Sequence, residues 1–211
     1  MDYTLYNYWR SSSSWRVRIV LSYKNIPYNY RSVNLAEGES QLEEHIQRNP
    51  LKQVPVLVTP EVKLSQSMAI LRFLEAKHPQ PSLVPTQSDL AAKMWEICEI
   101  VNSGIQPLQN MSVTERIEQL GGDKNQWISE NIKKGFRAIE KIVKHSSEEF
   151  CIGNHMTLAD ACLLPQYYAA VKHYNLDMSE FPHIQRVCEK LVLLPQIQSS
   201  FPENQPDYPE Y

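Results

Sequence analysis

Four consecutive serines, Ser11 to Ser14, stand between two stretches with regular hydrophobic patterns. Residues 3–9 before them alternate apolar and polar side chains, which predicts a short strand. Residues 15–23 after them carry apolar side chains at helical spacing, which predicts a helix. Serine is a preferred N-cap, and a helix start offers unpaired N–H groups and the positive end of the dipole. The run therefore predicts a strand-to-helix turn that suits an anion, with an ordinary cap and surface serines as the alternative.

The following residues extend this turn into a small mixed sheet. Residues 28–35 alternate and are rich in β-forming side chains, so they predict a second strand. The strand–helix–strand order predicts a right-handed crossover and a parallel strand pair. Residues 53–58 and 62–64 predict a hairpin, residues 36–48 a short surface helix, and residues 68–78 an amphipathic helix. We therefore expect an α/β N-terminal domain with the element order βαβ and then ββα.

Prolines punctuate residues 81–85 and mark the best domain boundary in the sequence. We expect a first domain over residues 1–80, a linker over 81–86 and an all-helical domain over 87–211. The last residues, 201–211, contain three prolines and no core pattern, which predicts a surface position. Thr157 and Asp160 form a capping-box-like pattern ahead of an apolar run. The expected helices cover residues 88–111, 127–145, 158–171 and 181–194.

Charge and cysteine content exclude several classes of protein. The 21 basic and 24 acidic residues give a formal charge of −3, which argues against a nucleic-acid or anionic-membrane surface. No apolar run is long enough to span a bilayer, and the first residues lack a signal-peptide pattern. The 4 cysteines form no CxxC pair, and no histidines have metal-ligand spacing, so we expect no metal. Buried, reduced thiols in a cytoplasmic protein are the expected state.

Five short motifs, spread along the chain, point to one family. The first reads Ser-Ser-Ser-Ser-Trp-Arg-Val-Arg-Ile and the fourth Gly-Ile-Gln-Pro-Leu-Gln-Asn. Together they resemble the zeta-class glutathione transferases, the maleylacetoacetate isomerases, over about residues 3–208. The resemblance implies the cytosolic glutathione transferase architecture, with a thioredoxin-like N-terminal domain and an all-α C-terminal domain. The motifs occupy residues 11–19, 49–55, 66–70, 104–110 and 157–166.

The resemblance also implies an activity. Family members are glutathione-dependent cis–trans isomerases that convert maleylacetoacetate to fumarylacetoacetate in tyrosine and phenylalanine breakdown. It further implies glutathione as the cofactor, a small-molecule substrate, a homodimer and a cytoplasmic location. Two alternatives remain open: a glutathione transferase or dehalogenase acting on small α-halo acids, and a non-catalytic interaction protein on the same fold.

By resemblance, the serine run holds the catalytic residues. Ser11 is the expected catalytic hydroxyl, which stabilises the glutathione thiolate, and Ser12 and Ser13 flank the sulfur and the substrate. Ser13 departs from the family pattern, which has cysteine at this position. A second departure follows Gly38-Glu39, where relatives usually carry a glutamine that resembles a glutathione ligand. Either Ser40 or Gln41 serves in its place or the contact is lost, and we expect Gln41.

Further glutathione contacts follow from the other motifs. The Val54–Pro55 bond would be trans by base rate, but the resemblance implies a cis bond that presents the Val54 backbone to the glutathione peptide. Gln66 and Ser67 open a helix, where they can hold a carboxylate. Pro107 predicts a kink in the helix that carries Gln106 and Asn110 four residues apart on one face. The expected contacts from the helical domain are Gln106, Asn110 and Ser112.

Three basic side chains are candidate substrate ligands. Arg16 begins a helix, where a positive charge opposes the dipole, so an acidic ligand would explain it. By resemblance, Lys172 falls near a family arginine that meets the substrate carboxylate, and His173 is a rival one residue further on. The alternative for Lys172 is a solvated surface residue.

Overall fold

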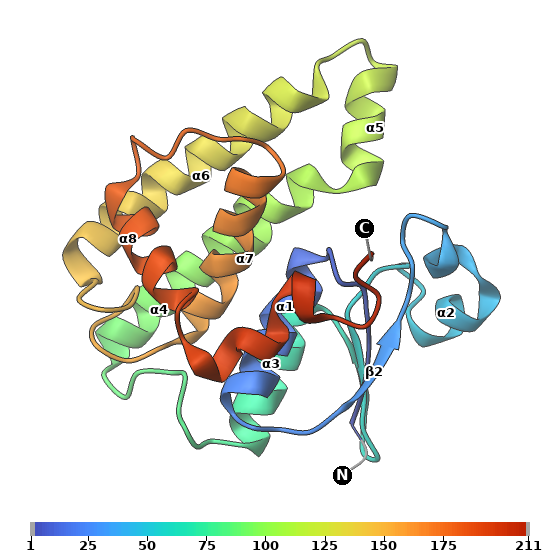
Figure 1. Cartoon of the computed structure of the whole chain (residues 1–211), viewed down its shortest axis with the longest axis horizontal. Coiled ribbons are helices and arrows are strands. Elements are labelled where there is room, and N and C mark those ends of the chain that lie inside the picture. The colour runs from blue at the N-terminus through green and yellow to red at the C-terminus, as the bar shows by residue number, and fades with distance from the viewer. Residues whose placement is uncertain (1–2, 210–211) are drawn as a thin grey trace. The chain divides into compact units, whose positions relative to one another are not determined.

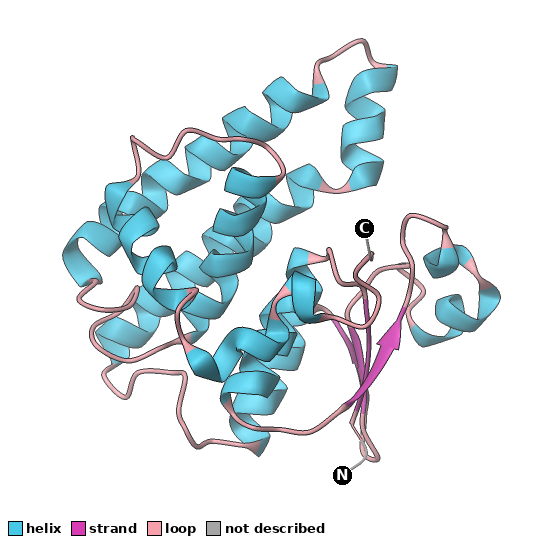
Figure 2. Cartoon of the chain, viewed as in Figure 1, coloured by secondary structure: helices cyan, strands magenta, loops and turns pink. Residues whose placement is uncertain are grey.

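The computed structural model describes residues 3–209 of the chain. Two compact units are present, the first made of Met1–Pro81 with Leu194–Tyr211 and the second of Ser82–Leu193. Figure 1 traces the chain from end to end, and Figure 2 shows the strands, all drawn within the first unit.

The first unit is built on a four-stranded mixed sheet with the order β2-β1-β3-β4. Strand β1 (Thr4–Asn7) pairs in parallel with β2 (Asn29–Ser32), as expected for a βαβ unit. It pairs on its other side with β3 (Val56–Val58), which forms an antiparallel hairpin with β4 (Lys63–Ser65). The predicted βαβ–ββα order is therefore confirmed.

Helices cover this sheet. Figure 1 shows α1 (Ser12–Tyr23) and α3 (Ser67–Lys77) together beside the sheet, with α2 (Glu43–Arg48) beyond β2. Helix α1 is enclosed, because all residues from 14 to 21 are buried, including two arginines. The single helix expected over residues 36–48 is wrong. Gly38 adopts a φ of 74°, and only the short turn η1 (Glu39–Gln41) and α2 are helical.

The end of the chain also differs from the expectation. The C-terminal segment from Leu194 belongs to the first unit, not to the helical domain. The surface position expected for residues 201–211 is confirmed for most of residues 201–209, of which only Pro202 and Gln205 are buried, and residues 210–211 lie outside the described residues. Its 3-10 turns are η4 (Pro195–Ser200) and η5 (Pro202–Asn204), and η4 packs on α1. The indole N–H of Trp15 donates to the Ser200 hydroxyl at 3.1 Å, and the Trp15 ring meets Phe201 edge-on at 5.0 Å. Aromatic side chains far apart in sequence thus hold the tail against α1.

The second unit is helical. Its α-helices are α4 (Ser88–Glu99), α5 (Met111–Gln119), α6 (Lys124–Ser146), α7 (Leu158–Lys172) and α8 (Pro182–Leu191). Helix α7 is the buried one: residues 158–166 are all buried, and α7 packs on both α4 and α8. This matches the sequence, which is apolar nearly all round the helix. No helix among residues 3–209 is long and apolar enough to cross a membrane.

The predicted capping box at the start of α7 is confirmed. The Asp160 carboxylate accepts hydrogen bonds from the Thr157 backbone N–H at 2.8 Å and the Thr157 hydroxyl at 2.9 Å. It also accepts one from the Cys151 N–H at 2.8 Å, which ties the preceding loop to the helix. Burial raises the pKa of the Asp160 carboxyl, and these three donors oppose the rise.

The continuous helix expected over residues 88–111 is wrong. The α-helical pattern stops at Glu99, continues as the π-helical segment η2 (Ile100–Ile105), and then as the 3-10 turn η3 (Gln106–Gln109). Pro107 lies in the first turn of η3, where its missing N–H is tolerated. The expected kink is thus a change of helix type, and α5 starts afresh after Asn110.

Candidate active site

Ser11 is the N-cap of α1. Its backbone is extended, with φ −70° and ψ 114°, and its Oγ accepts a hydrogen bond from the Ser14 N–H at 3.2 Å. Its own N–H donates to the Tyr8 carbonyl at 3.0 Å. A hydroxyl has one donor and two acceptor sites, so the cap uses an acceptor and leaves the proton available. Capping and donation to an anion are therefore compatible roles for Ser11.

Ser12 and Ser13 form the start of α1, and their side chains are half-buried. The first turn of the helix carries no acidic side chain, so nothing on it opposes a negatively charged ligand. The positive end of the dipole and the Ser11 hydroxyl both favour the ionised form of a thiol held there. The three predicted catalytic serines thus lie together at one helix terminus, and their roles stay predictions.

Resistance to thiol alkylation is an expected consequence of serine at position 13. Cys98, Cys151, Cys162 and Cys188 are all buried. Burial raises the pKa values of the Cys151 and Cys188 thiols well above the ordinary value, which suppresses the reactive thiolate. Native protein treated with iodoacetamide at neutral pH should keep its activity and remain unlabelled by peptide mass spectrometry. The matched variant Ser13→Cys should become labelled in this loop, whereas a loss of wild-type activity after the same treatment would contradict this expectation.

The Val54–Pro55 bond is cis, as the resemblance implies. Val54 comes directly before β3, and no backbone hydrogen bond within residues 3–209 uses its N–H or carbonyl. Both groups are therefore available to pair with an extended peptide ligand, as an added strand would.

Two buried side chains hold the loop that leads to Val54. The Asn49 amide donates to the Gln53 carbonyl at 2.9 Å, and the His45 Nε2 lies 3.1 Å from the same oxygen. The Asn49 side-chain oxygen in turn accepts from the Leu51 N–H at 3.1 Å. The sequence identified Asn49 only as part of a motif, and nothing in the local pattern pointed to His45.

Gln66 and Ser67 open α3, and their surroundings favour an anion. Gln66 is exposed and has a φ of 75°, an uncommon backbone conformation for a residue with a side chain. Ser67 is buried, and its hydroxyl accepts from the Arg16 guanidinium at 3.2 Å. Arg16 is fully buried. The observed contact makes it a support for Ser67, and direct binding of an acidic substrate stays a prediction.

The loop before α2 offers one accessible side chain for the expected glutathione contact. Ser40 is buried, with 6% of its surface exposed, whereas Gln41 is exposed. The Gln41 N–H donates to the Gly38 carbonyl at 2.8 Å, which closes the η1 turn and leaves its side-chain amide outside. Of the two residues considered for this contact, Gln41 therefore has the more available side chain.

The second unit brings its three predicted glutathione contacts to one turn. The Gln106 amide donates to the Asn110 side-chain oxygen at 2.9 Å, and exposed Ser112 follows in the first turn of α5. Lys172 and His173 lie at the end of α7, and both side chains are exposed. The His173 ring meets the Tyr168 and Tyr174 rings edge-on at 5.9 and 6.5 Å.

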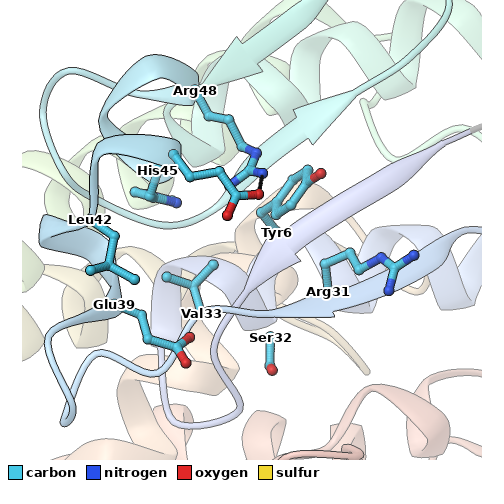
Figure 3. Close-up of a pocket in the computed structure, with 9 residues that line it drawn as sticks. Tyr6, Arg31, Ser32, Val33, Glu39, Leu42, His45 and Arg48 are labelled. Carbon is cyan, nitrogen blue, oxygen red and sulfur yellow. Dashed lines mark hydrogen bonds and ion pairs between the residues drawn. The ribbon is translucent and has the colours of Figure 1, made fainter.

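A surface pocket of about 460 Å³ lies elsewhere in the first unit (Figure 3). Arg48 sits 4.2 Å above the Tyr6 ring and is paired with Glu44, so its charge is already compensated. None of the predicted site residues lines this pocket, and we do not assign it to the active site. The described residues also contain no group of three or more side chains able to hold a metal ion. The lining residues are Tyr6, Arg31, Ser32, Val33, Glu39, Leu42, Glu44, His45 and Arg48.

Comparison with known proteins agrees with this geometry. The glutathione S-transferase N-terminal domain matches residues 1–76, and the glutathione S-transferase C-terminal domain matches residues 107–200. A maleylacetoacetate isomerase of Dictyostelium discoideum is 40% identical over 208 residues, covering 96% of this chain and 94% of the relative.

Solved structures give the same result. A bacterial maleyl pyruvate isomerase, a zeta-class glutathione S-transferase, superposes with a TM-score of 0.94 at 32% identity, covering 98% of this chain and 100% of that chain. Maleylacetoacetate isomerase from Anaeromyxobacter dehalogenans 2CP-1, solved with bound GSH, gives 0.89 at 40% identity and covers 99% and 98%. A second structure of that enzyme, with the same values, holds dicarboxyethyl glutathione and citrate. The chain therefore belongs to the glutathione S-transferase family, among the zeta-class and maleylacetoacetate isomerase proteins.

Proposed function

We propose that this protein is a glutathione-dependent cis–trans isomerase acting on maleylacetoacetate. The observation that carries the proposal is Ser11, which caps α1 with its oxygen and keeps its hydroxyl proton for a thiolate. Membership of the maleylacetoacetate isomerase group supports the choice of substrate. The pathway served would be tyrosine and phenylalanine breakdown.

The residues of the first unit fit glutathione in three places. The Ser11 hydroxyl and the α1 terminus suit its sulfur, and the Val54 N–H and carbonyl suit its peptide backbone. Gln66 and Ser67, backed by the buried Arg16 charge, suit its γ-glutamyl carboxylate. We infer that Gln41, Gln106, Asn110 and Ser112 add further contacts.

The chemistry needs little beyond an activated sulfur. Bound glutathione supplies a thiolate that adds reversibly to the conjugated double bond, so the bond becomes single, rotates, and reforms trans as the thiolate leaves. Ser11 lowers the pKa of that sulfur by donating to its ionised form, and Ser12 and Ser13 flank the reacting carbons. Negative charge that develops on the substrate carbonyl is stabilised by the donors at the α1 start. A relative solved with dicarboxyethyl glutathione supports an addition step of this kind.

Two rival functions predict different outcomes. A transferase or dehalogenase acting on small α-halo acids would consume glutathione, whereas the isomerase returns it. A non-catalytic interaction protein would bind no glutathione, although the residues at Ser11, Val54, Gln66 and Ser67 disfavour that case. Incubating the folded protein with maleylacetone and glutathione tests the proposal. We expect isomerisation, and halo-acid turnover without isomerisation would contradict it.

Lys172 is the better candidate for a substrate carboxylate than His173. Both side chains are exposed at the end of α7, but the His173 ring already packs edge-on against two tyrosine rings. Lys172→Ala should raise the KM for maleylacetone about tenfold and leave kcat within a few-fold, because a binding charge is lost rather than a catalytic group. Lys172→Arg should restore or improve affinity, since guanidinium binds a carboxylate through two donors. An effect of His173→Ala alone would reverse the assignment.

Location and assembly complete the proposal. We infer a cytoplasmic homodimer, on the resemblance to the family. Light scattering of the purified protein tests the second point, because a dimer has twice the 24.5 kDa mass of the chain.

A further inference from the structure

The loop that leads to Ser11 is held in place by side chains from outside the loop. Residues 8–10 join β1 to the α1 cap, and three of their backbone groups are held by distant side chains. The Tyr8 carbonyl accepts from the Ser11 N–H at 3.0 Å, so any shift of this loop moves the serine directly. The position of the Ser11 hydroxyl therefore depends on whatever fixes Tyr8 and Trp9.

Arg18 fixes the loop from the α1 side. Its guanidinium is fully buried and donates to the Tyr8 carbonyl at 3.2 Å and the Trp9 carbonyl at 3.0 Å. Its remaining donors reach Asn7 at 2.9 Å and the Ser200 carbonyl at 3.0 Å, in the tail. Burial lowers the pKa of Arg18 to about 10, which still leaves it charged at neutral pH. The Arg18 guanidinium therefore links the loop to Ser200 in the C-terminal segment.

Asp207 fixes the same loop through the backbone N–H of Trp9. One carboxylate oxygen accepts from the Trp9 N–H at 3.1 Å, and the other accepts from the Tyr30 hydroxyl in β2. The Tyr208 ring meets the Trp9 ring edge-on, with centroids 4.9 Å apart. Burial and the Asp207 bond raise the pKa of Tyr30, so its hydroxyl stays protonated as a donor. Both the N–H and the carbonyl of Trp9 are therefore occupied.

We propose that Asp207 and the C-terminal tail are positioning elements for Ser11, which set how well its hydroxyl stabilises the glutathione thiolate. Asp207 lies 196 positions beyond Ser11 in the sequence and acts through the Trp9 backbone, not by touching a ligand. The inference rests on the proposed function only in taking Ser11 as the hydroxyl that faces the sulfur. Its test therefore measures the pKa of the bound glutathione thiol, whether or not the protein isomerises a substrate.

The test compares Asp207→Ala with Asp207→Asn and with Glu203→Gln, which removes an exposed charge from the same tail. The readout is the ultraviolet absorbance of the bound glutathione thiolate, titrated with pH. Asp207→Ala should raise the apparent pKa of the bound thiol by about one unit, equal to about a tenfold weaker thiolate. Asp207→Asn keeps one acceptor oxygen, so its bound-thiol pKa should lie between those of Asp207→Ala and the wild type. Glu203→Gln should match wild type.

The pH profile separates positioning from simple loss of structure. The titratable or charged groups around the loop are Tyr8, Arg10, Arg18, Tyr28, Tyr30, Glu37 and Asp207. Burial raises the pKa values of the three tyrosines, so their ionisation at alkaline pH is kept apart from that of the bound thiol. Turnover of Asp207→Ala should fall about tenfold at neutral pH and recover at alkaline pH, where the thiolate forms unaided. The affinity for glutathione should stay within a few-fold, because Val54, Gln66 and Ser67 are untouched.

Two results would overturn the inference. One is an unchanged thiol pKa in a folded Asp207→Ala protein, and the other is a loss of turnover that is equal at every pH. If Asp207→Ala does not fold, Tyr30→Phe tests the same set of contacts by removing one donor to the Asp207 carboxylate. An unchanged thiol pKa in that variant would also contradict the inference. A wild-type protein that binds glutathione as the thiolate but isomerises nothing would contradict the proposed function. The effect of Asp207 on the pKa of the bound thiol could still be measured in that case.

Discussion

Replacing Ser11 by alanine should lower kcat for maleylacetone isomerisation by about 100-fold, comparable to losing one preorganised donor to a developing anion. The structure gives the reason, because the Ser11 oxygen caps α1 while its proton is left for the sulfur. The bound glutathione thiol should show a higher pKa in the same variant. Stopped-flow kinetics and thiolate absorbance measure both effects.

Two further substitutions control for the lost cap. Alanine at an N-cap costs about 0.5–2 kcal/mol of stability, whereas glycine costs only a few tenths. Ser11→Gly should therefore keep near-normal stability and lose the activity, which separates donation from capping. Ser11→Thr retains a hydroxyl and should keep part of the turnover. Full activity in a folded Ser11→Ala protein would remove Ser11 from the catalytic role.

Replacing Asp160 by alanine should destabilise the protein by about 3 kcal/mol or more, the largest stability effect that we expect. Asp160 is fully buried, and its loss leaves three buried donors without an acceptor, each costing about 1–3 kcal/mol. The start of α7, the buried helix of the second unit, would lose its capping box. Urea unfolding followed by circular dichroism measures the change in the free energy of unfolding.

The matched control is an exposed carboxylate in the same unit. Glu130→Ala removes a charge from the solvent side of α6 and should change stability by less than about 0.5 kcal/mol. Asp160→Asn keeps one acceptor oxygen and should cost less than Asp160→Ala. A loss below about 1 kcal/mol in Asp160→Ala would mean that water or rearranged neighbours satisfy the donors.

Local patterns were enough to predict most of the fold. Alternation at residues 3–9 predicted β1, the serine run predicted the α1 cap, and the Thr157–Asp160 pattern predicted the start of α7. Each of these signals depends on residues within a few positions of one another. The continuous helix over residues 88–111 failed because periodicity does not distinguish α-helical from π-helical and 3-10 turns.

The tail and the two buried arginines could not be predicted in the same way. Residues 201–209 lack a core pattern, because their partners are Trp15 on α1 and Trp9 in the loop before it, far away in sequence. No sequence pattern singled out Arg18, and only the folded chain shows it bound to Tyr8, Trp9 and Ser200. Long-range contacts of this kind leave no periodic signal. The candidate ligand residues came from motif resemblance, and the structure adds the supports behind them.

Glutathione accounting during turnover tests the central claim most directly. The protein is incubated with maleylacetone and with glutathione far below the substrate concentration, and NMR follows the substrate geometry while a thiol assay follows glutathione. Reversible addition predicts that all the cis substrate becomes trans and that free thiol is unchanged at the end. Turnover that stops after one equivalent of glutathione, with thiol consumed and no trans product, would contradict the isomerase assignment.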